Sequence, residues 1–199
     1  MKRLYIADIN SLVSRTGEIQ GHYRAVFENW LDIFRTVADV RIAAGPTVAK
    51  KFSQCACVLP CESMRGSTWF LNKLKNLINM RILLHRAQGD VIVFQSSALA
   101  MVWLGIALFA DCRTRIFVIN YTAEMSCFAS LMYAWAKRKI TGNICTMKEV
   151  AESLGVKAFL VPDYLYVKPG IPRLRSEEKM NYDYAIVGII NQSKGVLEV

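Results

Sequence analysis

Two polar residues lie where an α/β protein would place its chemistry. Tyr121 and Glu124 follow residues 115–120, an apolar run that predicts a buried strand. Open α/β sheets bind ligands outside the carboxyl ends of their strands, so both side chains are candidates for contact with a substrate. A solvated loop carboxylate is the alternative for Glu124. Residues 95–97 also follow an apolar run, but helix capping accounts for their two serines.

A second candidate region is the polar loop that follows the first predicted strand. Gly17 and Gly21 lie in this loop, and His22 opens an amphipathic helix. The glycines could contact a substrate or could serve only as turn residues. For His22, capping or simple solvation is the alternative to a functional role.

The six cysteines, at positions 55, 57, 61, 112, 127 and 145, raise the question of a metal site. The cluster at positions 55, 57 and 61 contains no CxxC pair and has no neighbouring histidine, so we interpret it as reduced structural thiols. We therefore expect no metal and no other cofactor. Reduced thiols and an N-terminus unlike a signal peptide favour a cytoplasmic protein.

The elements that would position these residues alternate between strand and helix. Apolar runs predict strands at residues 4–7, 40–43, 57–59, 91–94, 115–120, 143–146 and 158–161. Helical periodicity predicts helices at residues 23–37, 69–86, 98–110, 127–139 and 148–154. Gly45 and Pro46 should break the second strand, and residues 48–66 carry the weakest pattern. This alternation predicts an α/β fold with a Rossmann-like, doubly wound parallel sheet, in which residues 91–94 and 115–120 are neighbouring strands.

Residues 91–110 contain no charged side chain. A stretch of this length is about long enough to cross a bilayer as a helix. The polar break at residues 95–97 divides this stretch into a short β-branched run and a helix of ordinary length. We therefore predict a strand, a cap and a buried helix, with a membrane-spanning helix as the alternative.

Lys and Arg outnumber Asp and Glu by 25 to 16, which gives a formal net charge of +9. Such a charge favours polyanions, anionic lipid surfaces or phosphorylated substrates as partners. Nucleic acid is not expected, because the chain lacks an aromatic RNA-binding signature and zinc-finger spacing.

Residues 63–89 contain five Lys or Arg and no Asp or Glu, and the helix within them begins Trp69-Phe70-Leu71. This pattern resembles a helix on a membrane surface, so attachment to the inner face of the membrane is one interpretation. The alternative is a helix that packs on the sheet and keeps a solvated basic face. The apolar side of this helix is expected to consist of Phe70, Leu74, Leu77, Ile78 and Ile82.

The composition changes after residue 165. Residues 166–181 contain Pro169, Gly170, Pro172 and a run of charges, so we predict an interdomain linker after a first domain at residues 1–165. Residues 182–199 then read as one strand and a glycine-containing loop, the start of an incomplete second domain.

This second segment resembles part of a known family. After the strand, Gly188 is followed at family spacing by Lys194-Gly195, as in the G-R-L-x-x-x-K-G motif of GT-B-fold retaining glycosyltransferases of family four. Ile189 occupies the place of the family's arginine. The family also has a Gly-rich turn after its first strand, in the region of Gly17 and His22.

The resemblance implies transfer of a sugar from a nucleotide sugar to a polysaccharide or lipid-linked acceptor. The acceptor would contact Gly17, His22, Tyr121 and Glu124 in the first domain. The donor diphosphate would contact Gly188 and Lys194 in the second. The family's paired glutamates would lie beyond Val199, so we expect this chain to be a fragment that is inactive alone. The alternative is a non-catalytic α/β module, complete as it stands, that binds a nucleotide or a sugar.

Overall fold

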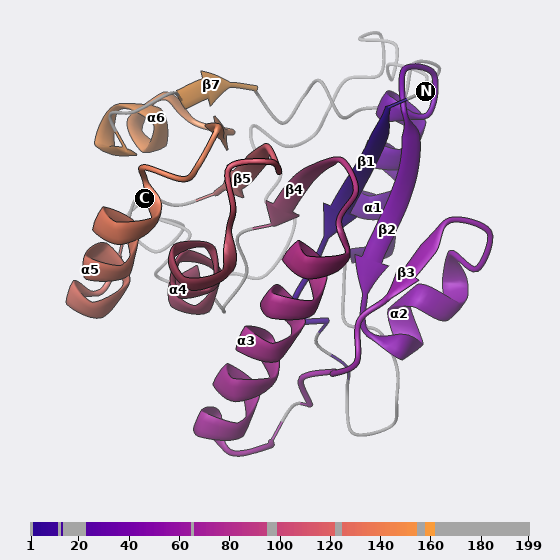
Figure 1. Ribbon diagram of the computed structural model, residues 1–199, viewed down its shortest axis with the longest axis horizontal. Coiled ribbons are helices and arrows are strands. Elements are labelled where there is room, and N and C mark those ends of the chain that lie inside the picture. The colour runs from indigo at the N-terminus through magenta and orange to yellow at the C-terminus, as the bar shows by residue number, and fades with distance from the viewer. Residues whose placement is uncertain are drawn as a thin grey trace, which may run out of the picture. The chain divides into compact units, whose positions relative to one another are not determined.

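The computed structural model describes residues 2–11, 13, 23–64, 66–94, 99–121, 125–154 and 158–161. They form an all-parallel, seven-stranded sheet with helices on both faces (Figure 1). The prediction of a Rossmann-like doubly wound α/β fold is therefore confirmed. The proposed linker at residues 166–181 and the segment at residues 182–199 lie outside the described residues.

The strand order is β3-β2-β1-β4-β5-β6-β7, so the direction of travel along the sheet reverses between β1 and β4. Val91 of β4 pairs with Ile116 of β5 in parallel register, which confirms that these two buried strands are neighbours. The strand bounds are β1 (Arg3–Ala7), β2 (Asp39–Ala44), β3 (Ala56–Val58), β4 (Asp90–Phe94), β5 (Ile116–Asn120), β6 (Gly142–Cys145) and β7 (Ala158–Leu160).

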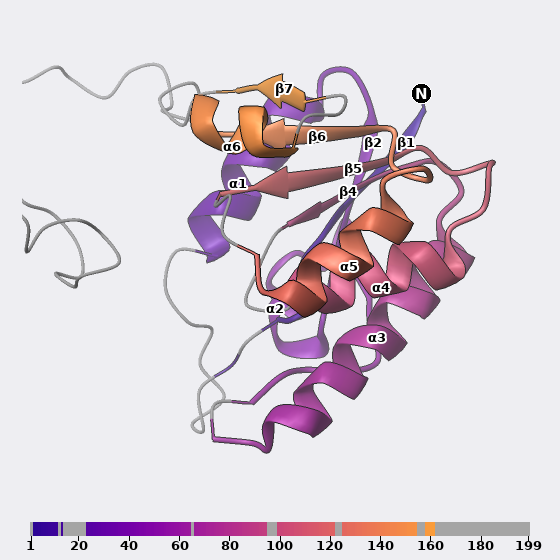
Figure 2. The same ribbon diagram turned by 90° about the vertical axis from the view of Figure 1, so that its left-hand side faces the viewer.

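The described helices divide between the two faces of the sheet. The chain moves one way from β1 to β3 and the other way from β4 to β7. Right-handed crossovers therefore place the connecting helices on opposite faces. The helices are α1 (Tyr23–Phe34) and α2 (Pro46–Lys51) on one face, and α3 (Trp69–Arg86), α4 (Leu99–Phe109), α5 (Cys127–Ala136) and α6 (Lys148–Leu154) on the other. Figure 2 shows α3, α4 and α5 side by side in one layer.

Each face has its own core, because alternate residues of a strand point to opposite sides of the sheet. Leu4 and Ile6 of β1 belong to the cluster under α1 and α2, whereas Tyr5 and Ala7 belong to the cluster under α3 to α6. The cluster under α1 is rich in aromatic residues. The Phe27 ring packs edge-on against Phe94, with centroids 5.4 Å apart.

The segment after β2 contains an element that the sequence pattern did not predict. The strand does end before Gly45 and Pro46, but Pro46 then occupies the first turn of α2, where its missing N–H costs nothing. Gly45 has no room for a side chain, because an added Cβ would lie 2.3 Å from the Cγ atom of Glu62.

The uncharged stretch at residues 91–110 is divided into a strand and a helix, as predicted, while the predicted cap at residues 95–97 lies outside the described residues. β4 ends at Phe94 and α4 begins at Leu99, so the stretch is not one continuous helix. Within the described part of the chain, no helix combines the length and the apolarity needed to cross a membrane.

Helix α3 has the predicted bounds, but the prediction of which side it buries was wrong. Phe70, Leu74 and Ile78 are exposed, and the helix instead packs through Met80, Leu83 and two asparagines. The asparagines are buried because they bond the loops that follow β1 and β3. The consequence is an apolar helix face that the described part of the sheet does not cover.

Gly105 should be sensitive to substitution, because α3 and α4 approach closely there. A Cβ at Gly105 would lie 2.1 Å from Cγ and 2.7 Å from Cβ of Met80. Alanine has the higher helix propensity, by about 1 kcal/mol, but overpacking costs about 1–3 kcal/mol. We expect Gly105→Ala to lower the free energy of unfolding by about 1–2 kcal/mol in denaturant titrations. The loss should be smaller in a Met80→Ala background, and an equal loss in both backgrounds would contradict the close contact.

Candidate functional site

The carboxyl edge of the sheet, beside the reversal between β1 and β4, carries a cluster of buried polar side chains. Doubly wound sheets bind their ligands at this kind of position, because the loops of the two neighbouring strands diverge there. The cluster comes from the loops after β1 and β3 and from the middle of α3. Its members are Asp8, Asn10, Ser11, Ser63, Asn76 and Asn79.

Asp8 closes the turn that follows β1. Its carboxylate accepts hydrogen bonds from the backbone N–H groups of Asn10, at 3.0 Å, and Ser11, at 3.1 Å. The Ser11 hydroxyl donates to the Asp8 carbonyl at 2.9 Å and accepts from the Gly45 N–H at 2.7 Å. Ser11 also has a positive φ of 39°, which is rare for a residue with a side chain. Strained backbone of this kind collects at ligand sites.

Burial raises the pKa of Asp8 to about 6, although the two backbone N–H donors act in the opposite direction. A carboxyl group that titrates so close to neutrality is characteristic of functional sites. Asp8 is fully buried, however, so what it does in this structure is fix the loop that carries Asn10 and Ser11.

Two asparagines of α3 tie this loop to the loop after β3. The Asn79 amide donates to the carbonyls of Ile9, at 2.8 Å, and Cys61, at 2.9 Å, and accepts from the Cys61 N–H at 3.0 Å. Asn76 donates to the Asn10 side-chain oxygen at 3.2 Å. Neither residue was predicted as a site residue from the sequence. The sequence signal that could have indicated them is a pair of amides three positions apart on a helix that runs along a sheet.

A further carboxylate of this edge is engaged within the protein. The Glu62 carboxylate accepts hydrogen bonds from both the backbone N–H and the hydroxyl of Thr47, the latter at 2.9 Å. These bonds hold the first turn of α2 against the loop after β3. Glu62 is thereby occupied as a structural acceptor.

One of the candidate residues predicted from the sequence, Tyr121, lies at the carboxyl end of β5. Tyr121 lies directly after β5, partly buried against the core under α1. Its backbone is two strands from β1, a distance of about 10 Å. Next to it, the Asn120 amide donates to the Asn143 side chain at 3.1 Å and fixes the ends of β5 and β6.

The other predicted contacts of the site cannot be placed in the same way. Gly17, His22 and Glu124, expected to bind an acceptor, lie outside the described residues. So do Gly188 and Lys194, expected to bind a donor phosphate. Among the predicted site residues, Tyr121 is therefore the one that lies within the described structure.

The thiols do not form a metal centre in the described part of the chain, where no group of three or more His, Cys, Asp or Glu side chains is arranged to hold an ion. Burial raises the pKa of the Cys55, Cys57 and Cys145 thiols. They are therefore protonated near neutral pH, and a protonated thiol is a poor ligand and a poor nucleophile.

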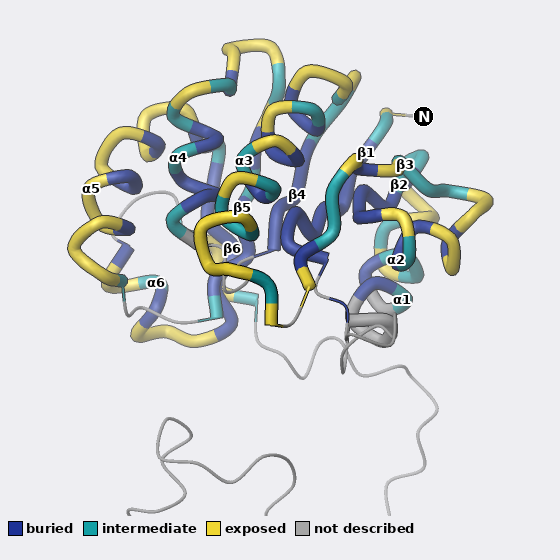
Figure 3. The backbone as a smooth tube through the Cα atoms, turned by 90° about the horizontal axis from the view of Figure 1, so that it is seen from below, coloured by how far each residue is buried: buried dark blue, intermediate teal, exposed yellow. Residues whose placement is uncertain are grey.

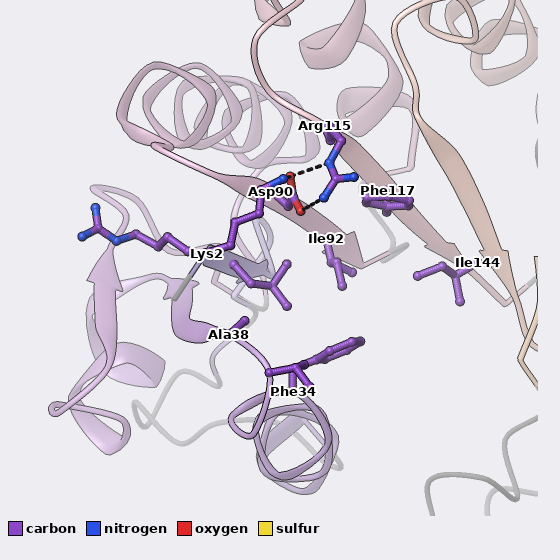
Figure 4. Close-up of a pocket in the computed structure, with 11 residues that line it drawn as sticks. Lys2, Phe34, Ala38, Asp90, Ile92, Arg115, Phe117 and Ile144 are labelled. Carbon is purple, nitrogen blue, oxygen red and sulfur yellow. Dashed lines mark hydrogen bonds and ion pairs between the residues drawn. The ribbon is translucent and has the colours of Figure 1, made fainter.

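The opposite, amino edge of the sheet carries an apolar groove of about 320 Å³. Figure 4 shows Phe34 of α1 on one side of it and Ile92, Phe117 and Ile144 of the strands on the other. The groove exists because α4, α5 and α6 all cross the other face of the sheet. Phe159 of β7, which pairs with Ile144, is likewise exposed on this face.

An ion cluster forms the rim of this groove. Asp90 accepts from Arg115 at 2.8 and 2.5 Å and lies 3.2 Å from the Lys2 ammonium (Figure 4). Burial disfavours the charged form of Asp90, but the bonds from Arg115 and Lys2 outweigh it and lower the pKa of this carboxyl. The cluster joins the starts of β1, β4 and β5, which is a structural role.

The chain was also compared with known proteins. No protein-family model matches it, and the curated proteins contain no match either.

The buried carboxyl of Asp8 should make stability depend on pH with a characteristic sign. Its pKa is higher in the folded state than the ordinary value, so the folded state binds more protons between about pH 4 and about pH 6. We expect the unfolding free energy of the wild type to fall, relative to Asp8→Asn, by up to about 3 kcal/mol as pH rises through this window. Denaturant titrations across the window measure this difference.

Asp111→Asn serves as the matched control. Backbone hydrogen bonds from Arg113 and Thr114 lower the pKa of the Asp111 carboxyl, so its contribution is lost as pH falls and has the opposite sign. If the difference in unfolding free energy between the wild type and Asp8→Asn does not change with pH, then burial does not raise the pKa of Asp8.

Proposed function

We propose that this chain provides the acceptor-side domain of a glycosyltransferase, and that it binds a saccharide or lipid-linked acceptor at the carboxyl edge of its sheet. The observation that carries this proposal is the polar, strained loop Asp8–Ser11 beside the reversal between β1 and β4. The resemblance to family-four glycosyltransferases supplies the reaction class.

A ligand rich in hydroxyl groups would meet a fixed polar edge here. Asn10, Ser11 and Asn120 are buried and hydrogen-bonded within the protein, so their side chains would hold the backbone of this edge in place for the ligand. Tyr121 adds an aromatic ring and a phenolic hydroxyl at the end of β5. Binding pockets typically combine such an apolar surface with a few fixed polar groups.

In the proposed enzyme, Gly17, His22 and Glu124 would add acceptor contacts to Tyr121, while Gly188 and Lys194 would contact the donor diphosphate. Negative charge builds up on the diphosphate as the glycosidic bond breaks. A cation such as Lys194, aimed at that charge, lowers the barrier. Asp8 would act as a positioning residue, through the loop that it holds.

One observation favours the second candidate, a non-catalytic module that binds a sugar or a nucleotide. In the described part of the carboxyl edge, the carboxylates of Asp8 and Glu62 are both engaged by groups of the protein itself. Neither is available as a general base. A domain that only binds would need no such base.

The proposed acceptor site can be tested by the chemical shifts of backbone amides. Titration with neutral oligosaccharides is expected to move the amides of Asn10, Ser11 and Tyr121, and to leave Asp90 at the opposite edge unmoved. Tyr121→Ala should weaken the binding about fivefold, the contribution of one aromatic contact. Trp135→Ala, which removes an exposed aromatic ring from α5, is the control and should change nothing. Shifts confined to the amino-edge groove would contradict the proposed site.

Calorimetry with nucleotide sugars separates the two candidate functions. In the resembling family the donor contacts come from a whole second domain, to which Lys194 would add a single phosphate contact, at most about 1 kcal/mol. We therefore expect no measurable binding of nucleotide sugars to the 199-residue chain. Micromolar binding would show instead that the first domain is itself the nucleotide site, and the binding module would then be the better interpretation.

A further inference from the structure

The outer face of the α3–α4–α5 layer exposes an unusual number of large apolar side chains. Trp69 and Phe70 of α3 are 74% and 67% exposed, and Trp135 of α5 is 60% exposed. Figure 3 shows the outward turns of α3 and α5 as exposed. The exposed apolar residues of the layer are Trp69, Phe70, Leu71, Leu74, Ile78, Leu108, Phe128, Leu131 and Trp135.

Single exposed apolar residues are normal, but a set spread over three adjacent helices marks an interaction surface. These side chains are not needed to hold the layer together. The three helices pack on the sheet and on one another through other residues, such as Met80, Trp103 and Met132. The outer apolar set is therefore left for a partner.

The charge on this layer identifies the chemistry of the partner. α3, α4 and α5 contain no Asp or Glu. Arg81, His85 and Arg86 lie in the second half of α3, and Lys137 and Arg138 follow α5, all of them exposed. An apolar surface whose three helices carry basic and no acidic side chains is complementary to an anionic lipid bilayer.

A pocket at the basic end of the layer strengthens this match. Its volume is about 360 Å³, and Arg81 and His85 of α3 line it together with Arg113 and Thr114 from the loop after α4. Neither guanidinium has an ion-pair partner among the described residues. Asp111, the acid at this pocket, accepts from the backbone N–H groups of Arg113 and Thr114.

We propose that the outer face of α3, α4 and α5 docks on an anionic phospholipid bilayer, and that the Arg81–His85–Arg113 pocket receives the phosphate of a lipid headgroup. Guanidinium groups bind phosphate oxygens in a forked, two-bond geometry, and this pocket offers two that form no ion pair among the described residues, although Arg113 helps to lower the pKa of the Asp111 carboxyl at the same pocket. The aromatic residues at the start of α3 lie roughly 20 Å along the helix from this pocket, and would enter the interfacial region of the same bilayer. This docking does not depend on the proposed sugar site.

The structure also selects which cations to test. Lys75 donates to the Glu62 carbonyl at 3.1 Å, and the Lys73 ammonium lies 5.5 Å from the centre of the Trp69 ring. Substituting either lysine would therefore disturb contacts within the protein. The side chains of Arg81 and Arg113 make no hydrogen bond or ion pair with the described residues, and Arg113 acts on Asp111 only through its charge, so their removal is the better test of lipid binding.

The test is flotation of the 199-residue chain with vesicles of phosphatidylcholine alone or mixed with phosphatidylglycerol. We expect binding to the mixed vesicles, weakened about 25-fold by Arg81→Ala with Arg113→Ala, or about fivefold for each arginine. Phe70→Ser with Leu74→Ser should weaken it at least about tenfold. Lys50→Ala with Lys51→Ala is the matched control. These two exposed lysines end α2 on the other face of the sheet, and their loss should have little effect.

Three results would overturn the proposal, provided that circular dichroism shows every variant to be folded. Equal binding to neutral and anionic vesicles would remove the preference for an anionic bilayer, because phosphatidylcholine also carries a headgroup phosphate. If the control variant in α2 weakens vesicle binding as much as the arginine variants do, the binding depends on net charge alone and not on this face. Absence of vesicle binding, together with self-association that Phe70→Ser and Leu74→Ser abolish, would identify the face as a contact between copies of the chain.

Discussion

The architecture depends on one constraint, which is that all seven strands are parallel. Each connection between parallel neighbours must cross a face of the sheet. Because these crossovers are right-handed, the direction in which the chain moves along the sheet determines which face each connection crosses. The reversal between β1 and β4 therefore puts α1 and α2 on one face and α3 to α6 on the other. The helices that connect β4 to β7 in turn, α4, α5 and α6, all lie on the same face.

Buried polar groups hold the loops that follow β1 and β3. Backbone donors and acceptors that leave a strand must find partners, or they cost free energy comparable to a lost hydrogen bond. Asp8 supplies acceptors to the turn after β1, and Asn79 supplies donors and an acceptor to two loops. A buried carboxylate with a raised pKa accompanies this rigid edge, where the acceptor site is proposed.

The fold could be predicted from the sequence because its signals are local. The bounds of α3 and the pairing of β4 with β5 follow from apolar periodicity within single segments. The short helix α2 was missed because Gly45 and Pro46 mark a strand end and a helix start alike. The buried side of α3 was misjudged for a different reason. Asn76 and Asn79 are buried by specific partners distant in the sequence, which periodicity cannot register. Of the candidate site, Tyr121 could be located because strand ends are predictable, whereas the polar cluster around Asp8 is a product of tertiary contacts.

The exposed strand β7 also implies an order in which the sheet opens. β1 is paired on both sides and packed on both faces, whereas β7 has one neighbouring strand in the described sheet and two exposed large side chains, Phe159 and Leu160. Local opening requires the least free energy where the fewest buried contacts are lost. Transient fraying should therefore begin at β7 and move inward, and β1 should be among the last strands to exchange its amide hydrogens. The reversal beside β1, where a ligand would sit, is thus built on the most persistent part of the sheet.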